Sequence, residues 1–105
     1  MSFSLSDSLL DGLVLAVLEP KDTYAYELSQ KLKASAAISE TTLYPMLKRL
    51  QKEGYVHSCE KTEDGRNRRY YNITDDGRQK LRHTKEEWIK FRGVMDQFLG
   101  GETNG

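Results

Sequence analysis

Three arginines on one short segment are the first residues whose type and spacing suggest chemistry. Arg66, Arg68 and Arg69 lie in the stretch EDGRNRRYYNIT at 63–74, and guanidinium groups bind phosphate oxygens through charge-assisted hydrogen bonds. The whole chain has 16 basic and 16 acidic residues and no formal net charge. Residues 39–74, however, carry seven basic and five acidic groups, and no other third of the chain is net positive. Charge alone favours a solvated face with local ion pairs, and a phosphate-binding surface is the alternative.

These arginines are not expected to be equivalent. If Ile73 faces the core, the period-two alternation of a strand places Arg69 on the core side and Arg68 on the outer face. Arg66 near the tip and Arg68 are therefore the stronger phosphate candidates. Arg69 is expected instead to support a neighbouring tyrosine or to pair with Glu60.

A second polar group follows Ser39. The outward face predicted for the helix at 40–53 presents small hydroxyls early and cations late, which suits a helix whose first turn meets base edges and whose later turns meet phosphates. An ordinary amphipathic helix explains the same pattern. The residues of this face are Thr41, Thr42, Tyr44, Pro45, Lys48, Arg49 and Lys52.

The elements that position these residues follow from periodicity and turn signals. Helices are expected at 8–19, at about 25–34 with Tyr26, Leu28 and Leu32 facing inward, at 40–53 with a buried stripe, and at 75–99. The stripe of the third helix is Leu43, Met46, Leu47 and Leu50. Gly54 is expected to end that helix, and the chain leaves open whether Ser39 or Thr42 caps it. A cap at Ser39 puts Pro45 inside the helix, whereas a cap at Thr42 puts it in the first turn.

Two strand-like runs between the third and fourth helices predict a β-hairpin, at about 55–73. The TEDG signal at 62–65 marks its turn, and we expect a loop over about 62–67, longer than a two-residue turn. A mainly α chain in which three helices are closed by a hairpin is typical of a winged helix-turn-helix. We therefore expect such a domain over 1–74, a C-terminal dimerisation helix over 75–99 and a flexible tail at 100–105.

Large apolar residues recur along the last helix at alternating steps of three and four, a heptad-like seam. An exposed aromatic seam is unfavourable in water by roughly 25 cal/mol per Å², so a second copy of the chain is its expected cover. The residues expected at this interface are Leu9, Leu13, Leu81, Trp88, Phe91, Met95 and Phe98. Trp88 has two interpretations: an aromatic residue of the dimer core, or, with Phe91 and Met95, a platform for a planar aromatic or cationic compound.

The sequence offers no basis for an enzyme, a metal site or a cofactor. His57 and His83 have no partner at zinc-ligand or catalytic spacing, and no glycine-rich phosphate loop appears. Cys59 is the single cysteine, which fits a reducing compartment. The apolar run GLVLAVL at 12–18 is too short to cross a membrane and follows acidic residues, so a cytoplasmic protein without membrane contact is expected.

Three segments together resemble the PadR-type transcriptional regulators: YAYEL at 24–28, ISETTLYPMLKRLQKEGYV at 38–56 and DGRNRRYYNITDDGRQKL at 64–81. The resemblance implies a homodimeric winged-helix repressor of the short form, with one C-terminal helix, which binds a pseudo-palindromic operator and is released by small molecules. It also implies that Trp88 matches a tryptophan that lines a ligand pocket at the dimer centre in some members. Two positions depart from the family: Ala25 where glycine is common, and Asn67 where proline is common, a change expected to loosen the wing tip.

The resulting hypothesis is a ligand-responsive repressor with double-stranded DNA as its partner. Two alternatives remain: a winged-helix module that binds protein without DNA, and a small-molecule carrier that uses the dimer-centre pocket. The residues expected to contact DNA are Thr41, Thr42, Tyr44, Lys48, Arg49, Arg66, Arg68 and Arg69.

Overall fold

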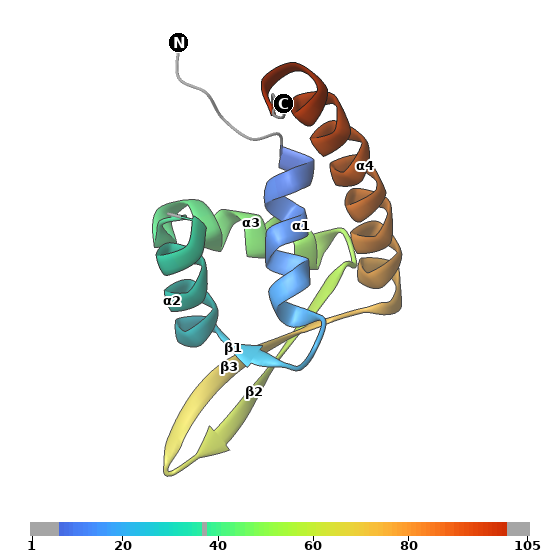
Figure 1. Ribbon diagram of the computed structural model, residues 1–105. Helices are drawn as coiled ribbons and strands as arrows, with labels where there is room; N and C mark the ends of the chain where they lie inside the picture. Colours follow the sequence, from blue (N-terminus) through green and yellow to red (C-terminus); the bar gives the residue numbers. More distant parts are fainter. Residues whose placement is uncertain (1–6, 37, 101–105) are drawn as a thin grey trace.

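The computed structural model describes residues 7–36 and 38–100. They form four helices and a three-stranded antiparallel sheet of order β1-β3-β2, with α1 and α4 side by side and the β2–β3 hairpin extending away from the helices (Figure 1). The mainly α fold with a hairpin wing and a long last helix is therefore confirmed. The elements are α1 (Asp7–Leu18), β1 (Thr23–Tyr24), α2 (Ala25–Ala36), α3 (Glu40–Lys52), β2 (Val56–Glu63), β3 (Arg66–Ile73) and α4 (Asp75–Leu99).

The core lies where α1, α2 and α3 meet the base of the sheet. α1 ends at Leu18, two residues before Pro20, which cannot donate a helical hydrogen bond. Its residues Val14, Leu15 and Leu18 are at most 1% exposed. The rest of the apolar core is Leu28, Leu32, Ile38, Leu43, Met46, Leu47, Leu50, Val56, Tyr71, Ile73 and Leu81.

The segment before α2 is a strand, where the sequence predicted only a connector. Thr23 pairs with Tyr71 and Tyr24 with Tyr70, so β1 adds a third strand to the hairpin. The prediction that Tyr26 faces inward was wrong, because its side chain is 62% exposed. Ser29 is buried on α2 instead, beside Leu28 and Leu32, so the helix turns its first tyrosine toward solvent next to the wing.

The structure decides the start of α3 in favour of Ser39, whose hydroxyl accepts a hydrogen bond from the Thr42 amide. Pro45 consequently lies inside the helix. The four predicted core positions of α3 are all buried. At the other end, the Gly54 amide bonds to the Gln51 carbonyl and the Tyr55 amide to the Leu50 carbonyl. This is a Schellman motif, which Gly54 permits through its φ of 86°.

The wing turn is shorter than expected. Asp64 and Gly65 alone connect the strands, with φ angles of 52° and 76°, the signature of a type I′ turn. The predicted loop over 62–67 was therefore wrong, because pairing continues to Glu63 and Arg66. The Thr62 hydroxyl donates a hydrogen bond to the side-chain oxygen of Asn67 across the strands, so this departure from the family lies within a paired strand.

α4 begins on the hairpin and ends beyond the core. Thr74 caps it by accepting a hydrogen bond from the Gly77 amide at 3.0 Å. Leu81 and Thr84 are buried, and Thr84 lies directly against Gly12 of α1. From Trp88 onward the helix carries large exposed apolar side chains, which are Trp88, Ile89, Phe91, Val94, Phe98 and Leu99. These residues make α4 an overhanging arm in a molecule of 58 × 26 × 26 Å.

Candidate nucleic-acid interface

The outward face of α3 presents the predicted polar residues to solvent. Thr41, Thr42, Tyr44 and Lys48 are exposed. The Ser39 hydroxyl lies 2.9 Å from that of Thr41 and 3.3 Å from that of Thr42. The first turn of α3 therefore gathers three hydroxyls, groups that donate to base edges or phosphates and accept from them.

Tyr44 follows this hydroxyl cluster along α3 and is also exposed. Its phenol donates a hydrogen bond to Glu40 at 3.4 Å. Partial burial raises its pKa, and the charge and hydrogen bond of Glu40 add to the effect. Tyr71 of β3 contributes last and raises the pKa of Tyr44 further. A neutral phenol at this position donates a hydrogen bond without carrying a charge that phosphate repels.

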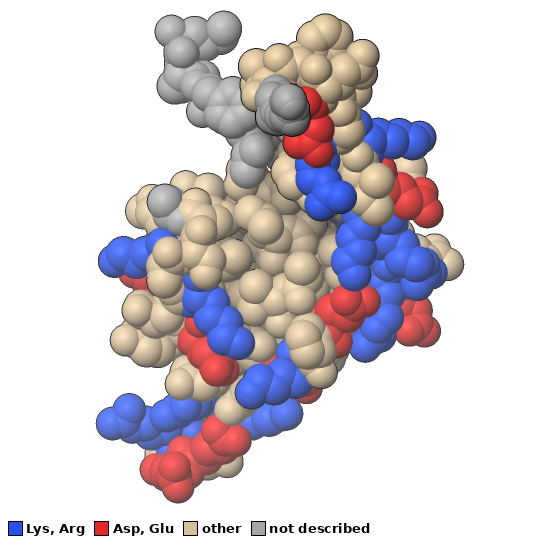
Figure 2. Space-filling model, in the orientation of Figure 1, with Lys and Arg blue, Asp and Glu red and all other residues tan. Residues whose placement is uncertain are grey.

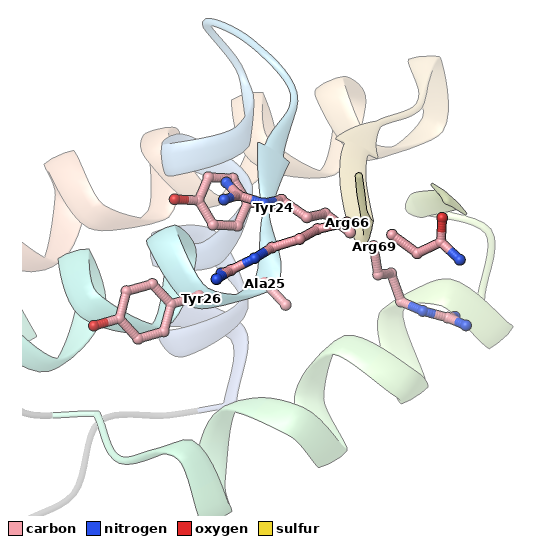
Figure 3. Close-up of a pocket in the computed structure, with 7 residues that line it drawn as sticks. Tyr24, Ala25, Tyr26, Arg66 and Arg69 are labelled. Carbon is pink, nitrogen blue, oxygen red and sulfur yellow. The ribbon is translucent and has the colours of Figure 1, made fainter. Parts of the chain in front are cut away.

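The wing directs its arginines to two sides. Arg66 points toward Tyr24 and Tyr26, whereas Arg69 points away from them, as Figure 3 shows. Nη2 of Arg69 lies 3.3 Å from a Glu60 carboxylate oxygen, which confirms the predicted pair. The guanidinium carbon of Arg68 lies 4.5 Å from the centre of the Tyr24 ring. Alternation along β3 thus separates Arg69, whose guanidinium is held by a carboxylate, from Arg66 and Arg68, whose guanidinium groups lie on the side of Tyr24.

That hollow lies between the wing and the start of α2 and has a volume of about 500 Å³. Sequence reasoning missed its aromatic wall, Tyr24 and Tyr26, because it assigned one to a connector and the other to the core. The signal was present in the segment YAYEL at 24–28, which places one tyrosine directly before α2 and one in its first turn. The lining residues are Tyr24, Ala25, Tyr26, Arg66, Asn67, Arg68 and Arg69.

The surface charge is mixed rather than uniformly basic. Figure 2 shows Lys and Arg alternating with Asp and Glu along the wing and the helices on this face. Lys61 of β2 lies 3.6 Å from a carboxylate oxygen of Asp22 and 4.6 Å from the centre of the Tyr70 ring. Lys61 and Arg69 are thus held by partners within the protein. The wing therefore presents a few oriented cations and no polycationic surface.

Arg49 occupies a different environment from the other predicted DNA contacts. Its guanidinium lies 2.6 Å from Asp11 of α1 and 3.4 Å from Glu53. The structure therefore brings Thr41, Thr42, Tyr44 and Lys48 together on one open face, and engages Arg49 with acidic groups of the protein itself.

A separate apolar groove of about 350 Å³ lies between α1 and α4. It is lined by Leu9, Gly12, Leu13, Ala16, Leu81, Thr84, Lys85 and Trp88. Leu81 is only 2% exposed, so the protomer's own core already covers this predicted interface residue. Trp88 and Phe91 are 42% and 39% exposed, with ring centres 6.0 Å apart, and Phe98 is 74% exposed.

The described part of the chain lacks metal-ligand groups and membrane-spanning helices. Residues 7–36 and 38–100 contain no group of three or more His, Cys, Asp or Glu that could hold a metal ion. Within the same residues, no helix is both long and apolar enough to cross a membrane.

Three helices closed by a hairpin wing, with a polar helix face and arginines beside it, define a winged helix-turn-helix protein of the DNA-binding class. The chain belongs to the PadR-like family of transcriptional regulators, whose pattern matches residues 14–83. This membership establishes DNA-binding regulation of transcription as its general role, and it agrees with the expectation that the chain is not an enzyme.

Solved structures of bacterial proteins support the assignment. A PadR-like regulator of Bacillus cereus strain ATCC 14579 is 35% identical, with a TM-score of 0.81 over 90% of this chain and 94% of that one. A protein of Streptococcus mutans UA159 is 36% identical, with a TM-score of 0.85 over 100% and 99%. A PadR family regulator of Clostridium difficile R20291 is 34% identical, with a TM-score of 0.76 over 86% and 97%. An uncharacterised protein of Lysinibacillus sphaericus is 34% identical over 97 residues, 88% of this chain and 89% of that one.

Proposed function

We propose that this protein is a homodimeric, ligand-responsive repressor that binds a pseudo-palindromic operator through α3 and the wing. The observation that carries the proposal is the pairing of two exposed polar surfaces. One is the hydroxyl-rich first turn of α3, and the other is the hollow bordered by Arg66 and Arg68. Base edges and backbone phosphates are the ligands that match these two chemistries.

The two surfaces have different roles in the proposed complex. Thr41 and Thr42 meet base edges in the major groove, and Tyr44 and Lys48 hold phosphates at its border. Arg66 and Arg68 bind the backbone beside the groove from the wing. Tyr26, exposed on the other wall of the hollow, adds a phenol donor to the same phosphate site.

Dimerisation through α4 is supported by the apolar surface that a single chain leaves open. Trp88, Phe91 and Phe98 are large and exposed on one overhanging helix, and the α1–α4 groove continues this apolar surface toward Leu9 and Leu13. A two-fold arrangement buries both copies of such a surface at once. Two reading helices then address half-sites about one helical turn apart.

The test of DNA binding uses the full chain and duplexes enriched by the protein from a randomised pool. Lys48, Arg66 and Arg68 supply three phosphate contacts per protomer, so log affinity should fall against log salt with a slope of about −5 for the dimer. Arg66→Gln should reduce the magnitude of this slope by about 2, because each dimer loses two contacts. Affinity that does not change with salt would refute the proposal.

The effector response has its own test, because Trp88 is the single tryptophan of the chain. Planar aromatic compounds that stack on the indole should quench its fluorescence and weaken operator binding at the same concentrations. Quenching without any change in DNA affinity would contradict the ligand response, whereas ligand binding by a protein without DNA affinity would favour the small-molecule carrier. The absence of quenching would leave Trp88 as an interface residue only.

A further inference from the structure

Asp11 and Arg49 form an ion pair between α1 and α3. Nη2 of Arg49 lies 2.6 Å from Oδ1 of Asp11, whose side chain is only 4% exposed. A carboxylate at this depth has lost its hydration, so its charge depends on a close cationic partner. The further ion-pair partner of Arg49, Glu53, is a residue of the same helix end at 3.4 Å. The guanidinium is thus directed to the junction of the two helices.

A neighbouring face of α1 packs against α4. Gly12, the residue after Asp11, lies so close to Thr84 that an added Cβ would meet the Thr84 methyl at 2.6 Å. Leu13 and Trp88 line the groove beside this contact. α1 therefore contacts α4 directly at Gly12 and contacts α3 through the ion pair of Asp11 with Arg49.

The ion pair lies on the same helix as the proposed DNA contacts, at some distance from them. Thr41 precedes Arg49 by eight residues, about 12 Å along a rigid helix. Lys48 is the neighbour of Arg49 and is exposed. A small rotation of α3 at Arg49 therefore displaces the hydroxyl cluster that the proposed function assigns to base edges.

We infer that Arg49 is a positioning residue and not a DNA contact: through Asp11 it fixes the orientation of α3 on α1. The inference rests on the proposed function and changes the role that the sequence suggested for Arg49. It also makes the pair a coupling element, since a displacement of α1 relative to α4 would act on α3 through the ion pair.

The experiment compares wild type, Asp11→Asn, Arg49→Gln and the double variant, each shown by circular dichroism to be folded at the assay temperature. Binding is measured by fluorescence anisotropy against a duplex selected by the wild type and against a random duplex of the same length, at several salt concentrations. Each single variant should lose about tenfold in affinity for the selected duplex, and the double variant should lose no more, because both changes break one interaction. Affinity for the random duplex and the salt slope should stay within error of wild type, since no phosphate contact is removed.

Two control variants separate positioning from contact. Glu53→Gln removes the ion pair of Arg49 with Glu53 and should leave both affinities unchanged. Lys48→Gln, at the position before Arg49, should weaken binding to both duplexes and reduce the magnitude of the salt slope by about 2 for a dimer. If Arg49→Gln behaves like Lys48→Gln while Asp11→Asn behaves like wild type, Arg49 contacts phosphate directly and the inference is overturned.

If Asp11→Asn does not fold, a double variant that keeps both charges provides the test. Asp11→Glu combined with Arg49→Lys restores a charge pair, because the longer acidic side chain compensates for the shorter basic one. It should recover discrimination between the two duplexes relative to Arg49→Lys alone, and no recovery would contradict the inference. A wild-type protein that cannot distinguish the selected from the random duplex would refute the proposed function itself, whereas full discrimination by all four proteins would refute only the positioning role.

Discussion

The guanidinium of Arg68 stacks over the ring of Tyr24, with 4.5 Å between its central carbon and the ring centre. This contact joins the wing strand β3 to β1, directly before α2. Because β1 also pairs with β3 through its backbone, the base of the wing is held from two directions. The orientation of the arginine therefore depends on a residue that carries no charge.

Substitutions of Tyr24 and of Arg68 should have different effects on DNA binding. Tyr24→Leu removes an interaction of about 0.5–1 kcal/mol but leaves the charge of Arg68, so operator affinity should fall two- to five-fold with an unchanged salt slope. Arg68→Gln should instead reduce the magnitude of the slope by about 2 for a dimer. Binding isotherms at four or more salt concentrations separate the two outcomes. A reduced slope for Tyr24→Leu would mean that the tyrosine does more than position the arginine.

Two glycines of α4 should respond in opposite directions to alanine. A Cβ at Gly77 would lie 2.2 Å from the Tyr55 carbonyl oxygen and 2.7 Å from Ile73, whereas nothing lies within 4 Å of one at Gly93. Gly77→Ala should therefore destabilise the fold by about 1–3 kcal/mol through overpacking. Gly93→Ala should stabilise it by about 0.5–1 kcal/mol, because alanine favours the helix. Urea unfolding of both variants tests the pair, and a loss of stability in Gly93→Ala would indicate a packed partner on that side of α4.

The apolar arm of α4 gives a prediction about assembly. Phe98→Glu places a charge where the proposed interface buries a ring, so it should raise the dimer dissociation constant at least tenfold, consistent with about 1.5–3 kcal/mol for burial of such a side chain. Gln97→Glu introduces the same charge one position earlier, on a different side of the helix, and should change the constant by less than about twofold. Sedimentation velocity over a concentration series measures both. Equal effects would place the dimer contact elsewhere.

Tyr70 provides a prediction for alkaline pH. Its phenol donates a hydrogen bond to Glu63, and this bond is the main cause that raises its pKa above the usual 10.0. A folded-state pKa above the unfolded one means that the stabilising contribution is present below pH ~10 and is lost as the pH rises through the folded value. Glu63→Gln should return the Tyr70 pKa toward 10.0. An NMR titration of labelled tyrosine rings gives the answer, and an unaltered pKa in the variant would assign the shift to another cause.

The sequence predicted the elements whose signals are long and periodic. Leu43, Met46, Leu47 and Leu50 repeat over about two turns, so the sequence pattern predicted the buried face of α3 directly. β1 was missed because two residues carry no periodicity, and only its pairing with β3 defines it as a strand.

The errors at the site have local physical causes. Tyr26 was placed inside because an aromatic ring is apolar by type, yet this ring lies open to solvent beside the hollow of the wing. The turn was predicted too long, although Asp64-Gly65 is itself a sequence that favours positive φ at both positions. The assignment of Arg49 to DNA stays a prediction, and helical projection could not reveal that its guanidinium contacts a buried carboxylate 38 positions away in the chain.

α4 is one unbroken helix that carries both its anchor in the core, Leu81, and the start of the proposed interface, Trp88, seven residues later. Inserting one residue between them would turn the apolar seam by about 100° and advance it by about 1.5 Å, whereas inserting seven would nearly restore its direction. In a dimer joined by that seam, the number of residues between Leu81 and Trp88 therefore sets the relative orientation of the two α3 helices. The spacing of a palindrome would then be encoded far from any residue that touches a base.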